Sequence, residues 1–125
     1  MSIPFIDLQA QRLRLAGKIE AAVQEAVVGG AWVMGPQVRQ FEADLAAFGQ
    51  AKHALGCANG TDALVLPLMA WGVGAGDAVF CPSFTFTATA EIVPWTNAEP
   101  VFVDVDPVTY NIDPAALERA IEGIK

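Results

Sequence analysis

Basic residues are few in this sequence, and they form no cluster. Seven Lys and Arg residues stand against 14 Asp and Glu residues, which gives a net charge of -7. A protein that follows a nucleic-acid backbone needs clustered Lys and Arg to neutralise the phosphates. The composition therefore argues against nucleic acid as the main ligand.

The sequence also lacks long apolar runs and a secretory leader. No stretch approaches the ~18 consecutive apolar residues that a membrane-spanning helix requires. Pro4, Asp7 and Arg12 interrupt the region in which a signal peptide would carry its apolar core. The two cysteines, Cys57 and Cys81, form no CxxC pair and are predicted to be buried structural thiols. We therefore expect a cytoplasmic protein without a membrane segment.

Apolar residues are abundant instead, at 54% of the 125 residues, whereas charged residues make up 17%. This is more apolar than a typical soluble domain. A chain of this length forms one ordinary domain or part of a larger one. We expect part of its apolar surface to be covered by the rest of its polypeptide or by another subunit.

Residues 1–50 are predicted to form an N-terminal helical segment. Apolar residues at spacings of three and four indicate an amphipathic helix over residues 12–28. After a loop at residues 31–35, Pro36 suits the first turn of a second helix. The predicted buried stripe of that helix consists of Val38, Phe41, Leu45 and Phe48.

Residues 51–125 are predicted to alternate between strands and helices, which is typical of an α/β fold with a parallel sheet. Because a sheet of three strands would leave open edges, we expect the natural domain to continue beyond residue 125. The predicted strands are residues 53–58, 78–81 and 101–104, and the predicted helices are residues 61–71, residues 85–95 and a last helix that starts at Pro114 with Asp113 as its cap.

The segment C-A-N-G-T-D-A-L at residues 57–64 predicts a cradle for phosphate. A strand ends, Asn59 and Gly60 turn the chain, and a helix starts at Thr61. The first N–H groups of a helix attract anions, Gly60 permits close approach and the Thr61 hydroxyl adds a donor. In the alternative interpretation, Asn59 and Thr61 only cap the helix. The segment is neither a Walker A loop nor a dinucleotide fingerprint.

Two later segments contain further candidate residues. Phe84 and Phe86 follow a predicted strand, where an aromatic ring either stacks on a flat ligand or packs in the core. Asp104 and Asp106 resemble a carboxylate pair for a metal, but an Asp-Pro turn explains them better. His53 stands alone. We therefore predict no metal site.

These segments together resemble the DegT/StrS family of nucleotide-sugar aminotransferases of fold type I, which depend on pyridoxal 5'-phosphate (PLP). The similarity covers nearly the whole chain. The matching stretches, in order, are F-I-D-L-Q, W-V-M-G-P, F-E, C-A-N-G-T-D-A-L, G-A-G-D-A-V, C-P-S-F-T-F-T-A-T-A-E and E-P-V-F-V-D-V-D-P-V-T-Y-N-I-D-P.

The resemblance implies that residues 51–125 are the first part of the large PLP-binding domain. Gly60, Thr61 and Asp62 would then hold the PLP phosphate, Thr61 through its hydroxyl and Asp62 through its backbone N–H. Phe86 would stack on the pyridine ring. The lysine that forms the Schiff base is expected beyond residue 125, because the lysines present do not match its motif (Lys18, Lys52 and Lys125).

For activity, the resemblance implies transfer of an amino group, from glutamate as donor, to a nucleotide-linked keto-sugar. Within the family, the chain resembles the UDP-2-acetamido-3-oxo-glucuronate aminotransferases. This resemblance implies a role in the biosynthesis of cell-surface polysaccharides or amino sugars. A homodimer with shared active sites is implied as well, with Trp32, Gly35 and Pro36 near the substrate. This chain alone is expected to be inactive.

Three alternatives remain. A relative in which histidine replaces the lysine would dehydrate deoxysugars. A non-catalytic member would bind PLP or a sugar nucleotide and act as a regulator. A metal-dependent glycosyltransferase would use Asp104 and Asp106 and would not respond to PLP.

Overall fold

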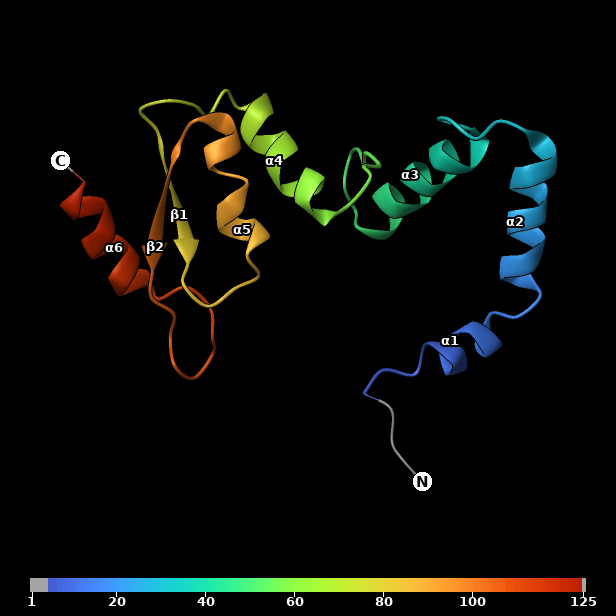
Figure 1. Cartoon of the computed structure of the whole chain (residues 1–125), viewed down its shortest axis with the longest axis horizontal. Coiled ribbons are helices and arrows are strands. Elements are labelled where there is room, and N and C mark those ends of the chain that lie inside the picture. Colours follow the sequence, from blue (N-terminus) through green and yellow to red (C-terminus); the bar gives the residue numbers. More distant parts are fainter. Residues whose placement is uncertain (1–4, 125) are drawn as a thin grey trace. The chain divides into compact units, whose positions relative to one another are not determined.

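The computed structural model describes residues 5–124, and the chain in it forms two compact units, Met1–Gly56 and Cys57–Lys125. Figure 1 shows the helices and strands of both units. Two residues named in the sequence analysis lie outside the described residues. They are Pro4, which argued against a signal peptide, and Lys125, one of the three lysines that do not match the catalytic motif. Within residues 5–124, every helix is too short or too polar to cross a membrane.

The first unit is helical, with α1 (Leu8–Arg14), α2 (Lys18–Gly29) and α3 (Pro36–Phe48). The single helix predicted over residues 12–28 is wrong, because the chain breaks at Gly17. Gly17 has a φ of 82°, which interrupts the right-handed helix. Its N–H donates to Glu20 Oε2 at 2.6 Å, so the side chain of Glu20 satisfies a donor at the start of α2.

The helix predicted from Pro36 is confirmed as α3, with Pro36 as its first residue and Gly49 directly after its end. Its predicted buried stripe is not buried in the part of the chain that the structure describes. Phe41 is 58% exposed and Phe48 is 88% exposed. The first unit therefore presents apolar side chains to solvent instead of forming a core from them.

The second unit is built around two parallel strands, β1 (Ala78–Pro82) and β2 (Glu99–Val103). Their register pairs Ala78 with Glu99 and Pro82 with Val103, so both strands end at the same edge. Figure 1 shows α5 and α6 on opposite sides of the two strands. The helices of this unit are α4 (Gly60–Ala70), α5 (Ala88–Glu91), the 3-10 helix η1 (Pro94–Thr96) and α6 (Pro114–Gly123).

Small and branched apolar residues form the core of the second unit. Val93 and Cys81 are almost completely buried, at 0% and 1% exposure, and they pack with Val65, Ile92 and Ala98. Burial raises the pKa of the Cys81 thiol, because the charged thiolate loses its hydration. The predicted buried thiol is confirmed at this position.

Cys57 contradicts the same prediction, because its side chain is exposed. The reason is that the strand predicted at residues 53–58 is not formed: among residues 5–124, no neighbouring strand pairs with this segment. A strand needs a partner for its backbone groups, and here the Gly56 N–H donates instead to Glu42 Oε1 at 2.7 Å. The predicted three-stranded sheet therefore has two strands in the described chain.

The helix predicted over residues 85–95 is shorter than expected and is divided into α5 and η1. Pro94 has no N–H and cannot donate to the carbonyl of Ala90, so the α-helical pattern stops there. The N–H of Val93 bonds to that Ala90 carbonyl at 3.2 Å in a tighter turn. The last predicted helix is confirmed as α6, and the Asp113 side chain caps it by accepting from the Ala115 N–H at 2.9 Å.

Candidate functional site

The start of α4 offers hydrogen-bond donors that the described chain does not use. Asn59 is the cap residue, and the helix begins at Gly60. Neither the N–H groups of Gly60 and Thr61 nor the Thr61 hydroxyl has a hydrogen-bond partner among residues 5–124. These donors lie at the positive end of the helix dipole, where an anion is stabilised.

The space beside Gly60 is open. A Cβ atom built on this residue would meet no other atom within 4 Å, and its φ is not in the left-handed region. The backbone of the chain therefore does not require glycine here, which leaves close approach of a ligand as a physical reason for it. The donors and the open space together fit a phosphate group.

Asp62 contributes differently from the two residues before it. Its backbone N–H already donates to Asn59 Oδ1 at 2.9 Å, and its carboxylate accepts from Asn59 Nδ2 at 3.2 Å. Asn59 therefore caps the helix, as the alternative interpretation states, and leaves the Gly60 and Thr61 donors free within the described residues. For Asp62, the backbone donation to a phosphate that the sequence predicts competes with this cap.

Phe86 lies on the segment between β1 and α5, and its ring is 78% exposed. A cavity of about 230 Å³ adjoins it. This volume is below the ~300–1,000 Å³ of a complete ligand pocket, so the cavity is at most part of a site. It is lined by Pro82, Ser83, Thr85, Phe86, Thr87, Ala90 and Phe102.

Asp104 and Asp106 are both used as hydrogen-bond acceptors within the protein. Asp106 Oδ1 accepts from the N–H groups of Val108 and Thr109 at 3.0 and 2.7 Å. The backbone hydrogen bond from Thr109 is the main cause that lowers the pKa of Asp106. Within residues 5–124, no three His, Cys, Asp or Glu side chains lie close enough to hold a metal ion.

Trp32, Gly35 and Pro36 belong to the first unit, where each has a local structural role. Trp32 Nε1 donates to the Ala26 carbonyl at 3.1 Å. Gly35 is buried and precedes α3, and Pro36 occupies the first position of that helix. Their contact with substrate stays a prediction.

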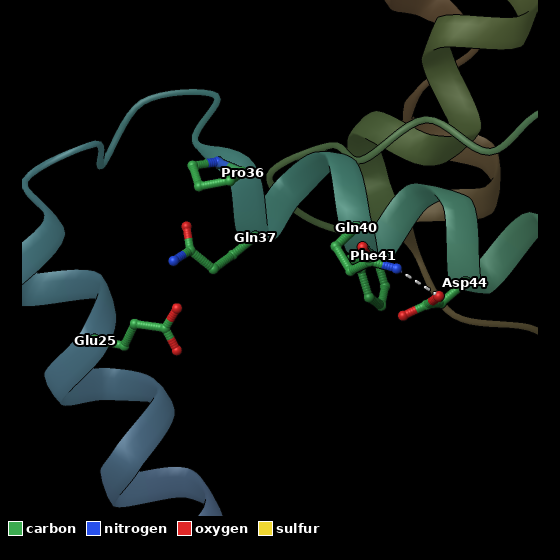
Figure 2. Close-up of a pocket in the computed structure, with 6 residues that line it drawn as sticks. All are labelled: Glu25, Pro36, Gln37, Gln40, Phe41 and Asp44. Carbon is green, nitrogen blue, oxygen red and sulfur yellow. Dashed lines mark hydrogen bonds between the residues drawn. The ribbon is translucent and has the colours of Figure 1, made fainter.

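A depression of about 500 Å³ between α2 and α3 is less suited to phosphate (Figure 2). Its lining includes two carboxylates, Glu25 and Asp44, and no basic residue. An anion would therefore be repelled there. The other lining residues are Pro36, Gln37, Gln40 and Phe41, and Gln40 Nε2 donates to Asp44 Oδ1 at 2.8 Å.

With this geometry in place, comparison with known families identifies the chain. The sequence profile of the DegT/DnrJ/EryC1/StrS aminotransferase family matches residues 14–124. The chain belongs to this family. The resemblance seen in the sequence motifs is thereby confirmed, and Gly60, Thr61 and Phe86 lie within the matched span.

Individual members of the family are closely similar. The UDP-2-acetamido-2-deoxy-3-oxo-D-glucuronate aminotransferase of Pseudomonas aeruginosa is 51% identical over 119 residues, which are 95% of this chain and 33% of that protein. The crystal structure of a family aminotransferase from Brucella abortus matches with a TM-score of 0.95 at 51% identity, over 98% of this chain and 33% of its own. The predicted fold class is therefore confirmed.

A putative sugar aminotransferase from Streptococcus pneumoniae, solved in its PLP-form, matches with a TM-score of 0.75 at 33% identity. The match covers 81% of this chain and 26% of that protein. The chain thus spans about a third or less of the length of the relatives it matches.

Proposed function

We propose that the protein containing this chain is a PLP-dependent aminotransferase that transfers an amino group to a nucleotide-linked keto-sugar. The observation that carries the proposal is the 51% identity to the glucuronate-type sugar aminotransferase, over 95% of the chain. The open donor set at the start of α4 supports it from the geometry. The proposed substrate is UDP-2-acetamido-3-oxo-glucuronate, and glutamate is the proposed amino donor.

In this proposal, the start of α4 binds the phosphate of PLP. The backbone N–H groups of Gly60 and Thr61 and the Thr61 hydroxyl donate to its oxygens, while the Asp62 carboxylate accepts from Asn59 Nδ2 at 3.2 Å. Charge-assisted bonds of this kind are about twice as strong as neutral ones. The three donors therefore anchor the cofactor at its phosphate end.

Phe86 has the complementary role of packing against the flat face of the pyridine ring. Its exposed ring offers a flat apolar face beside a small cavity, and stacking there excludes water from one side of the ring. When bound, PLP acts as an electron sink for the transfer of the amino group. The lysine required for that transfer is proposed to lie outside this chain, and the partner subunit of a homodimer to complete the site. Trp32, Gly35 and Pro36 are proposed to lie near the substrate.

The proposal is tested by the intact mass of the natural gene product with PLP, before and after borohydride reduction. We expect a mass well above 13.2 kDa and one PLP that reduction attaches covalently. A longer chain that binds PLP but retains none after reduction would indicate the dehydratase or a non-catalytic binder. A natural product of 13.2 kDa would end the enzyme proposal.

Replacing Thr61 with valine is expected to weaken PLP binding by the full-length protein about tenfold or more, because one charge-assisted hydrogen bond is lost. Valine keeps the shape of threonine, so the unfolding temperature of the apo protein should change little. The measurement is a PLP titration followed by absorbance. Thr61→Ser, which keeps the hydroxyl, is the matched control and should bind PLP like the wild type. Unchanged PLP retention in Thr61→Val would remove this residue from the cradle.

A further inference from the structure

Ser83 and Asp104 meet at the edge where both strands end. Each is the first residue after its strand, and the strands are paired in parallel with Pro82 opposite Val103. The Ser83 N–H donates to the Val103 carbonyl at 2.8 Å and extends the ladder by one residue. The Ser83 hydroxyl donates to Asp104 Oδ1 at 3.2 Å. Two hydrogen bonds thus fix the first residue of the segment that leads to Phe86.

Asp104 is itself held by a closed turn at residues 104–113. Its carbonyl accepts from the Asp113 N–H at 3.0 Å, and Val105 and Ile112 form an antiparallel bridge. Inside the turn, the Asp106 carbonyl accepts from the Tyr110 N–H at 2.8 Å. The turn is therefore closed at both its base and its tip.

A second contact joins this turn to the same segment. The rings of Phe84 and Tyr110 lie 5.6 Å apart between centroids, with their planes tilted by 44°. Such tilted aromatic pairs are favourable beyond the area they bury. The segment is thus held at Ser83 and at Phe84, and Phe86 follows two residues later, with Ser83 and Phe86 lining one cavity.

We propose that Asp104 is a positioning residue that acts through Ser83 to hold Phe86 in place for the cofactor ring. The proposal rests on the proposed function, because it gives Phe86 the stacking role. Asp104 serves as an acceptor for the Ser83 hydroxyl and needs an oxygen at Oδ1, not a negative charge. This requirement separates the proposal from a metal-binding role, which would need the carboxylate.

The test uses the full-length protein and compares Asp104→Ala with Asp104→Asn, which keeps an acceptor oxygen in place. We measure the dissociation constant of PLP, the visible circular dichroism band of bound PLP and the unfolding temperature of the apo protein. Asp104→Ala and Ser83→Ala should each bind PLP about fivefold to tenfold more weakly. Both should change the dichroism band in the same direction as Phe86→Ala, and Asp104→Asn should resemble the wild type.

Asp104 Oδ1 also accepts from the Val105 N–H at 3.2 Å, a bond that Ser83→Ala keeps. Because Ser83 acts only through its bond to Asp104, the double variant Ser83→Ala/Asp104→Ala should lose no more affinity for PLP than Asp104→Ala alone. Additive losses would overturn the proposal, since they indicate independent structural effects. An Asp104→Asn variant as impaired as Asp104→Ala would also overturn it. If Asp104→Ala does not fold, the comparison of Ser83→Ala with the wild type still decides the outcome.

The positioning role of Asp104 and the proposed function can be refuted separately. If Phe86→Ala changes the affinity and the dichroism band but Ser83→Ala changes neither, the positioning role is wrong and the proposed function stands. If the wild-type protein does not bind PLP at all, the proposed function fails and this inference fails with it.

Discussion

Replacing Gly60 with alanine should weaken PLP binding by the full-length protein about a hundredfold or more. The new methyl group would enter the open space beside Gly60, where the proposed phosphate binds. Both charge-assisted bonds to the phosphate would then lengthen or break, and each contributes about 1.5–3 kcal/mol. The fold should tolerate the change, since the Cβ meets no atom within 4 Å.

The measurement is a titration with PLP beside one with pyridoxal, which lacks the phosphate. Only the affinity for PLP should fall, because the methyl group blocks the phosphate position alone. Gly29→Ala is the matched control: its Cβ also meets no atom within 4 Å and its φ is ordinary, but it lies at the end of α2. Equal losses for both ligands, or no loss for PLP, would contradict the cradle at Gly60.

Replacing Gly35 with alanine is expected to destabilise the protein by about 1–3 kcal/mol, as forced overpacking does elsewhere. A Cβ on Gly35 would clash with the Ala31 carbonyl oxygen, so the backbone of the loop must shift. The Gly35 carbonyl also accepts from the Val38 N–H at 3.2 Å, in the first turn of α3. A shift of the loop therefore also loosens the start of that helix.

Denaturant unfolding of the apo protein measures this effect. Gly29→Ala again serves as the control and should be neutral or slightly stabilising, since alanine favours the helix. The experiment also separates two roles for Gly35. A residue that only contacts substrate would leave apo stability unchanged when replaced and would raise KM instead. Unchanged stability in Gly35→Ala would contradict the steric role.

Signals that act over a few residues were readable from the sequence. Pro36 begins α3, Asp113 caps α6, and α4 begins at Gly60 after its cap Asn59, one residue before the predicted start at Thr61. Each of these depends on a backbone group within three or four residues, so the local residue type decides it. One failed prediction also has a local cause: Gly17 adopts a positive φ and divides one predicted helix into two.

Contacts between distant residues needed the tertiary structure. Ser83 and Asp104 are 21 residues apart, and only the register of two parallel strands brings them together. The sequence placed Ser83 two residues after one predicted strand and Asp104 at the end of another, but it did not specify which strands are neighbours or how they are aligned. The same limit explains Cys57, whose expected burial required a strand partner that residues 5–124 do not provide.

By itself, the sequence determined the family and the alternating α/β pattern, because family motifs and helix starts depend on neighbouring residues. The phosphate cradle at Gly60 and Thr61 stays a prediction. Only the tertiary structure showed that the Asp62 N–H donates to the Asn59 side chain and that Gly35 has no room for a side chain. It also showed that the Ser83 hydroxyl donates to Asp104. These facts depend on backbone angles and strand register, and those are set by packing across the fold, where residues far apart in the chain compete for the same space and the same hydrogen bonds.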